Sequence, residues 1–86
     1  MENVQQEVLG VLDLTLSLNG RSSTMNAKTQ LLGAVSELDS MAVVTVMVTL
    51  EERFGFIIED DDVDAATFAT VGSLTEFVES KVSALA

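Results

Sequence analysis

The chain has 86 residues with a formal net charge of −10, and it contains no histidine, cysteine, proline or tryptophan. This length predicts one small domain over residues 1–86. The excess of acidic side chains excludes nucleic acid as an expected partner, because phosphates bind to basic surfaces. It favours basic surfaces of partner proteins instead.

No apolar run in the sequence reaches the roughly 18 residues that a bilayer-spanning helix needs. The opening segment MENVQQEV also lacks the basic residues that begin a targeting peptide. We therefore expect a monomer in the cytoplasm without a membrane span. Because 48% of the residues are hydrophobic and none is proline, the composition predicts a compact helical domain.

The first predicted helix covers about residues 2–16. Its apolar residues recur with helical spacing: Val4, Val8, Val11, Leu12 and Leu16. The dipeptide NG at 19–20 predicts the end of this helix, and residues 20–38 form the longest irregular segment. Within that segment, Leu31 and Leu32 are expected to anchor the loop in the core.

The second predicted helix starts near Asp39 or Ser40, either of which suits its N-cap, and ends before Gly55. Its valines also suit a strand, but the apolar run is too long for a typical strand. One helical face carries the residues expected in the core: Val43, Val46, Met47, Leu50 and Phe54. Three further apolar residues lie away from that face, so packing in the core does not explain them: Met41, Val44 and Val48.

The last third of the chain predicts a short helix and then a long one. Three apolar residues should anchor the connection that leads to them: Phe56, Ile57 and Ile58. The short helix is expected over residues 65–69, with a break at 71–72. Ser73 is expected to cap the long helix in a capping box with Glu76, and this helix runs to about Ala84. Its inward residues are expected to be Leu74, Phe77, Val78, Val82 and Leu85. The predicted fold class is all-α, a small four-helix bundle with three longer helices and one short helix.

The segment EDDDVD at 59–64 has the densest charge in the chain. Asp60, Asp62 and Asp64 alternate as they do in a calcium-binding EF-hand loop. Such a loop also needs glycine at 65 and glutamate at 71, where this chain has alanine and valine. We therefore interpret the segment as a solvated acidic loop with, at most, weak and nonspecific cation binding.

Ser40 stands between acidic residues and a strongly apolar run. A nucleophilic serine needs a base, and this chain has no histidine. Two interpretations stay open for it: an ordinary residue at a helix start, or a site of covalent modification. A phosphate attached there would meet the positive end of the helix dipole and free backbone N–H groups.

Four features of the sequence, in this order, resemble the acyl carrier proteins over nearly the whole chain. They are the triplet DSM at 39–41, LEERFG at 50–55, the acidic loop, and TVGSL at 70–74. The resemblance implies that Ser40 receives 4′-phosphopantetheine from coenzyme A through a separate Mg-dependent phosphopantetheinyl transferase. Asp39 and Met41 flank that attachment site. The protein would then be a non-catalytic carrier that holds acyl groups as thioesters on the thiol of the arm.

The resemblance also implies a surface for partner recognition, on basic surfaces of enzymes that transfer or condense acyl groups. The residues expected to form it are Glu37, Asp39, Met41, Val44, Val48, Glu51 and Glu52. Housekeeping members of the family carry acids two and five residues after the serine, where this chain has Ala42 and Thr45. This departure indicates a specialised carrier within fatty acid, related lipid or secondary-metabolite synthesis.

Two alternatives to an acyl carrier remain. One is a carrier of aminoacyl or peptidyl groups in a nonribosomal pathway. The other is an interaction module with the same fold and no arm, because fold does not determine function.

Overall fold

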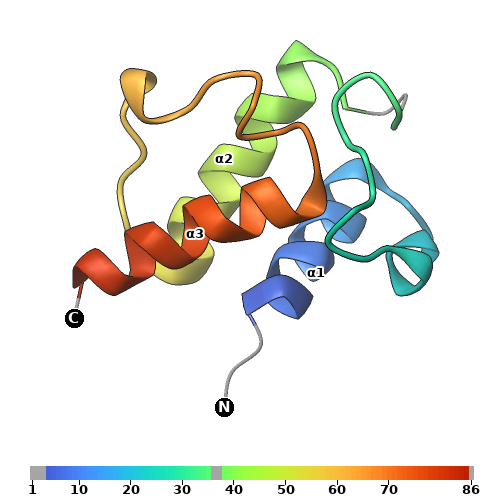
Figure 1. Ribbon diagram of the computed structural model, residues 1–86, viewed down its shortest axis with the longest axis horizontal. Helices are drawn as coiled ribbons and strands as arrows, with labels where there is room; N and C mark the ends of the chain where they lie inside the picture. The colour runs from blue at the N-terminus through green and yellow to red at the C-terminus, as the bar shows by residue number, and fades with distance from the viewer. Residues whose placement is uncertain (1–3, 36–37, 86) are drawn as a thin grey trace.

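Three α-helices form the framework of the chain (Figure 1). The computed structural model describes residues 4–35 and 38–85, without the side chains of Asp60 and Leu85. The helices are α1 (Val4–Leu16), α2 (Ser40–Phe54) and α3 (Val71–Leu85), and two 3-10 segments lie between them, η1 (Arg21–Thr24) and η2 (Asp60–Asp62). No strand occurs in the described part of the chain, and the all-α prediction is confirmed.

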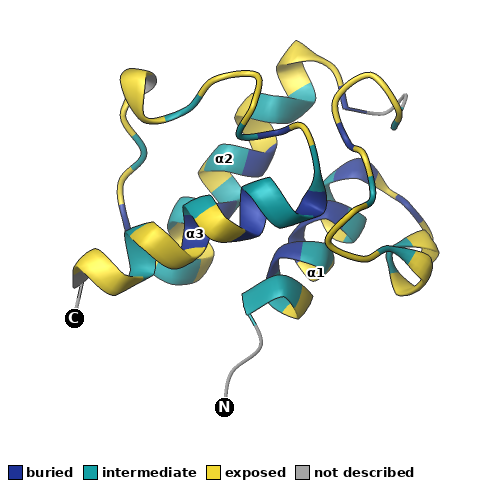
Figure 2. Cartoon of the chain, in the orientation of Figure 1, coloured by how far each residue is buried: buried dark blue, intermediate teal, exposed yellow. Residues whose placement is uncertain are grey.

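Helix α1 packs against both α2 and α3, so the core lies where the three helices meet (Figure 2). Every helix contributes residues that the sequence periodicity places inward. The buried apolar residues are Val8, Val11, Leu12 and Leu16 from α1, Val46 and Leu50 from α2, and Val71, Leu74 and Val78 from α3. None of the described helices is long and apolar enough to cross a membrane.

The two loops anchor through fewer apolar residues than the sequence predicts. Leu31 is fully buried, whereas the side chain of Leu32 is exposed. Phe56 is buried and Ile58 is half-buried, but Ile57 is 68% exposed. Because neighbouring residues of an extended segment point in opposite directions, a loop that touches the core with one side chain turns the next toward solvent. Leu32 and Ile57 were therefore wrongly predicted as anchors.

Residues 65–69 do not form the predicted short helix. They form hydrogen-bonded turns, in which Thr67 N–H donates to the carbonyl oxygen of Asp64 at 3.1 Å. The Asp64 carboxylate also accepts from the same N–H at 3.1 Å. Such short polar side chains compete with helical hydrogen bonds, and the only 3-10 turn of this loop in the described residues is η2.

Helix α3 begins at Val71, two residues before the predicted cap. The N–H of Ser73 donates to the Thr70 hydroxyl, and the N–H of Thr70 donates to the Ser73 hydroxyl, both at 3.0 Å. Thr70 therefore takes the capping position, and Ser73 is its reciprocal partner inside the first turn. The prediction that Ser73 caps the helix with Glu76 was wrong, and so was the predicted break at 71–72.

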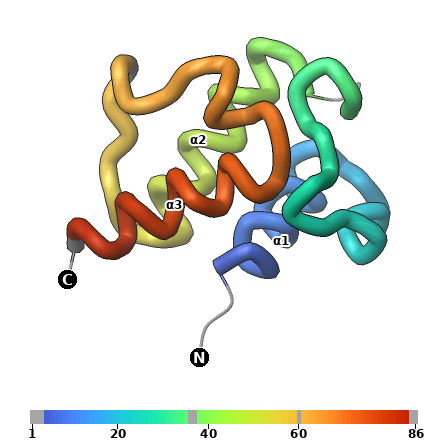
Figure 3. Tube along the Cα trace, viewed as in Figure 1, coloured from blue at the N-terminus to red at the C-terminus, as the bar shows by residue number. Residues whose placement is uncertain are grey.

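The segment over residues 27–32 runs beside the start of α3 (Figure 3). Val71 N–H donates to the carbonyl of Thr29 at 2.9 Å, and Leu31 N–H donates to the carbonyl of Ala69 at 2.8 Å. Gln30 and Thr70 form an isolated antiparallel bridge. These backbone contacts fix the long loop that leads to the start of α2.

Candidate functional site

Ser40 is the first residue of α2, and its side chain is exposed. Asp39 precedes it in an extended conformation, and the Asp39 carboxylate accepts a hydrogen bond from Ala42 N–H at 2.8 Å. Asp39 is therefore the N-cap, as the sequence allowed. No hydrogen bond of the Ser40 hydroxyl is found within the described residues, so this hydroxyl is available for chemistry.

The position of Ser40 suits an attached phosphodiester. The first N–H groups of a helix have no partner within the helix, and the helix dipole favours negative charge there. Because Asp39 satisfies one of these donors from the preceding residue, modification of Ser40 does not require the cap to be broken. The residues present fit a phosphate-linked group at Ser40.

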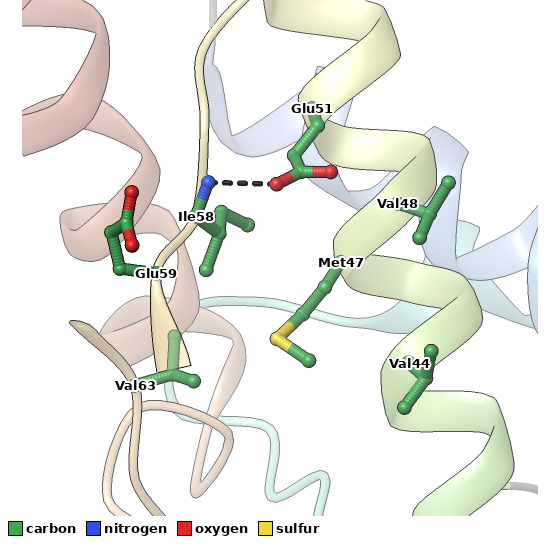
Figure 4. A pocket seen from close by; sticks show the side chains of 7 residues that line it. All are labelled: Val44, Met47, Val48, Glu51, Ile58, Glu59 and Val63. Atoms are coloured by element: carbon green, nitrogen blue, oxygen red, sulfur yellow. Dashed lines mark hydrogen bonds between the residues drawn. The ribbon is translucent and has the colours of Figure 1, made fainter. Parts of the chain in front are cut away.

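A groove of about 300 Å³ lies beside α2, between this helix and the segment over 58–63. Figure 4 shows Met47 reaching from α2 toward Ile58 and Val63, whereas Val44 and Val48 lie on the other side of the helix in this view. The groove is lined by Val44, Met47, Val48, Glu51, Ile58, Glu59 and Val63. Most of these residues are apolar, and the two carboxylates belong to Glu51 and Glu59.

The Glu51 carboxylate links the two walls of the groove. It accepts a hydrogen bond from Ile58 N–H at 2.7 Å, which ties the far wall of the groove to α2 (Figure 4). The sequence analysis placed Met47 in the core and did not predict the wall of the groove that Ile58 and Val63 form. Its second wall depends on a contact between residues seven apart across the end of a helix, which helical periodicity does not reveal.

Two comparisons with known proteins identify this arrangement. The family model of the phosphopantetheine attachment site matches residues 6–78. The chain belongs to the phosphopantetheine-binding acyl carrier protein family. The solution NMR structure of a holo acyl carrier protein from Nitrosomonas europaea is 47% identical, covers 96% of this chain and 99% of its own, and superposes with a TM-score of 0.87. No curated protein matches the chain.

Membership in the family defines the type of activity. The carrier is non-catalytic, and its cofactor is a covalently attached 4′-phosphopantetheine. When bound, this group supplies a terminal thiol that holds acyl groups as thioesters. The carrier works with a phosphopantetheinyl transferase and with acyl-handling enzymes.

The acidic loop of the carrier is an ordered structure. The Asp62 carboxylate accepts from Glu59 N–H at 2.8 Å and from the Lys81 ammonium at 2.9 Å. The Glu59 N–H, followed by Lys81, lowers the pKa of Asp62 below its ordinary value. Among the residues that the structure describes, no cluster of acidic side chains could hold a metal ion.

The residues predicted for partner recognition divide into three groups. Met41, Val44 and Val48 are exposed on α2, and Glu52 is exposed near its end. Asp39 and Glu51 are engaged in hydrogen bonds within the carrier. Glu37 lies outside the described residues.

Proposed function

We propose that Ser40 carries the phosphopantetheine arm, and that the protein delivers acyl groups as thioesters to enzymes of fatty acid, related lipid or secondary-metabolite synthesis. The observation that supports this most directly is an exposed hydroxyl without a hydrogen bond in the described residues, at the first position of α2 and on the helix that lines the groove. Flanking residues Asp39 and Met41 are expected to be contacted by the transferase.

Attachment forms a phosphodiester at Ser40 and breaks a phosphoanhydride bond of coenzyme A. Ser40 Oγ bonds to the phosphorus that bears the pantetheine, and the pyrophosphate bond of coenzyme A breaks. Adenosine 3′,5′-bisphosphate leaves, and the hydroxyl proton passes to a base on the transferase. The carrier has no histidine to accept that proton, so activation belongs to the transferase.

The groove beside α2 suits the acyl chain that the arm would hold. Val44, Met47 and Val48 line one side and Ile58 and Val63 the other, so a hydrocarbon chain would be removed from water there. NMR contacts between a loaded chain and the methyl groups of these residues would support this proposal. Unchanged methyl signals on loading would contradict it.

We also propose that this is a specialised carrier. Ala42 and Thr45 occupy positions where the resemblance leads us to expect acids, and this removes two charges from the surface that partner enzymes read. The long-range negative potential of the chain still favours encounter with basic surfaces. A location in the cytoplasm and a monomeric state accord with this proposal.

Intact mass after incubation with coenzyme A, Mg²⁺ and a broad-specificity phosphopantetheinyl transferase tests the attachment site. We expect the mass of one phosphopantetheine to be added to the protein and nothing to be added to Ser40→Ala. Because Asp39 provides the cap, Ser40→Ala should keep its helical circular dichroism and most of its stability. Addition to Ser40→Ala would refute the assignment of the site, and no addition to the parent protein would favour an interaction module without an arm.

A further inference from the structure

We propose that the negative charge of this carrier keeps the sulfur of its arm unreactive until a basic partner protein covers that charge. The inference rests on the proposed attachment at Ser40 and deepens it, because it gives the acids of the groove a role in the chemistry of the arm. They suppress the ionised thiol of the free arm, and they keep hydroxide away from the thioester of the loaded arm.

The groove proposed for the acyl chain carries charge of one sign. Glu51 lines it from α2 and Glu59 lines it from the opposite wall, and no lysine or arginine is among its described lining residues. Glu52 is exposed on the same helix, and Asp39 directly precedes the attachment serine. The hydrogen bond from Ile58 N–H orients the Glu51 carboxylate and leaves its charge in place.

The four basic residues of the chain do not offset this charge at the groove. Arg53, near the end of α2, donates from Nε to the Glu7 carboxylate at 2.7 Å. Lys81 of α3 donates to the Asp62 carboxylate at 2.9 Å. The other two lie within residues 20–29, in the loop that leads from α1 to α2. The positive end of α2 is compensated as well, because the arm would attach there through a negatively charged phosphodiester.

A negative field acts on the two anions that the chemistry of the arm requires. The thiol reacts in its ionised form, and negative charge nearby favours the protonated form. Hydrolysis of a loaded arm begins when hydroxide adds to the thioester carbonyl carbon. The carbon–sulfur bond then breaks, the cargo leaves as a carboxylate, and the sulfur takes the proton that the hydroxide carried. Because hydroxide is also an anion, the field lowers its local concentration too.

The size of the effect follows from the net charge, the size of the molecule and the salt concentration. The chain carries a formal charge of −10 and has a radius of gyration of 11.8 Å. The Debye length is about 30 Å at an ionic strength of about 0.01 M and about 3 Å at about 1 M. Coulomb's law with this screening predicts that the ionised thiol close to the surface decreases by roughly 5- to 10-fold at the lower ionic strength and by less than about 1.5-fold at the higher one.

A basic partner surface reverses this condition. It neutralises the field beside the groove, so the sulfur becomes reactive at the place where an enzyme can use it. The free carrier, by contrast, holds its thiol protonated and its thioester intact. The acidic composition therefore has a chemical role in addition to the acceleration of encounter with basic surfaces.

The test is the rate at which neutral iodoacetamide alkylates the thiol of the arm-bearing protein at neutral pH, with free 4′-phosphopantetheine as the reference. We expect the protein to react roughly 5- to 10-fold more slowly than the reference at about 0.01 M ionic strength, and at nearly the same rate at about 1 M. An oligolysine peptide, in place of a basic partner, should remove most of the difference at low salt. Hydrolysis of the acetyl-loaded arm should show the same salt dependence, since an acetyl group is too short to be shielded by burial.

Two pairs of substitutions with equal changes in net charge separate the groove from the rest of the surface. Glu51→Gln with Glu59→Gln removes both charges of the groove, and glutamine keeps a carbonyl oxygen that can accept from Ile58 N–H. Glu76→Gln with Glu79→Gln removes two exposed charges of α3 outside the groove. At low salt the groove pair should raise the alkylation rate more than the α3 pair, and at high salt neither pair should change it.

Circular dichroism checks that both pairs fold, and the salt dependence of the parent protein tests the proposal without any variant. A parent thiol that reacts like the reference at low salt would overturn the proposal. Equal increases in the two pairs would overturn the role of the groove acids. If the parent protein accepts no arm, the proposed function fails and this inference fails with it, whereas a loaded parent whose thiol reacts independently of salt rejects the inference alone.

Discussion

Replacement of Gly72 by alanine should test how closely the loop over residues 27–32 packs on the start of α3. A Cβ atom at residue 72 would lie 2.8 Å from the carbonyl oxygen of Ala27 and 3.3 Å from its Cβ. The N–H of Gly72 donates to that same oxygen at 2.8 Å, so backbone would have to move and this hydrogen bond would weaken. Overpacking costs about 1–3 kcal/mol and a hydrogen bond about 1 kcal/mol, while alanine gains up to about 1 kcal/mol in helix propensity. We expect a net loss of about 1–3 kcal/mol in the free energy of unfolding.

Gly10 provides the control for this substitution. It lies in the interior of α1, and a Cβ atom there would meet nothing within 4 Å. Gly10→Ala should therefore raise the free energy of unfolding by about 0.5–1 kcal/mol through helix propensity. Urea denaturation followed by far-UV circular dichroism measures both variants, with an unchanged m-value as the sign that the denatured state is the same. If Gly72→Ala is as stable as Gly10→Ala, the close contact between Ala27 and α3 is refuted.

Two further substitutions test hydrogen bonding in the core and in a loop: one at the buried hydroxyl of Thr75 and one at the carboxylate of Asp13. The Thr75 hydroxyl is buried and has no hydrogen-bond partner in the described structure, so Thr75→Val should raise the free energy of unfolding by about 1 kcal/mol in urea denaturation. A loss of stability would show that the hydroxyl has a partner. The Asp13 carboxylate accepts from the Ser22 hydroxyl at 2.7 Å, and this bond, together with the N–H groups of Gly20 and Ser22, lowers the pKa of Asp13 below its ordinary value of 3.8. The stabilisation is complete above the unfolded-state pKa and disappears as pH falls through the lower folded-state pKa. Parent and Asp13→Asn should therefore differ in stability at neutral pH and converge once the pH is below the folded-state pKa. A difference that persists in acid would refute this assignment.

Helical periodicity predicted the three long helices and most of their core because each buries one regular face. Val46 and Leu50 are buried, and Met41, Val44 and Val48 are left outside, as the two apolar faces of α2 require. The start of α2 was predictable as well, since an aspartate directly before an apolar helical run is a strong cap.

The loops could not be predicted in the same way, because their structure depends on contacts between segments. The choice of Thr70 over Ser73 as the cap of α3 follows from reciprocal hydrogen bonds and from the docking of residues 27–32. The sequence contains both residues and does not distinguish them. The far wall of the groove beside α2 was not predicted for the same reason, since it is linked to α2 by a hydrogen bond from Ile58 N–H to the Glu51 carboxylate.

The Glu51 carboxylate also shows that the number of acidic residues near Ser40 is not the number that a partner protein can bind. Asp39 and Glu51 both belong to the expected recognition set, yet each is held by a backbone N–H of the carrier itself. Breaking either contact to form an ion pair with a partner would remove a helix cap or detach one wall of the groove from α2. The new surface ion pair would stabilise the complex by only about 0–1 kcal/mol. We therefore expect an enzyme that approaches Ser40 to leave these two internal contacts intact. The same two carboxylates hold the start of α2, where Ser40 lies, and link the walls of the groove.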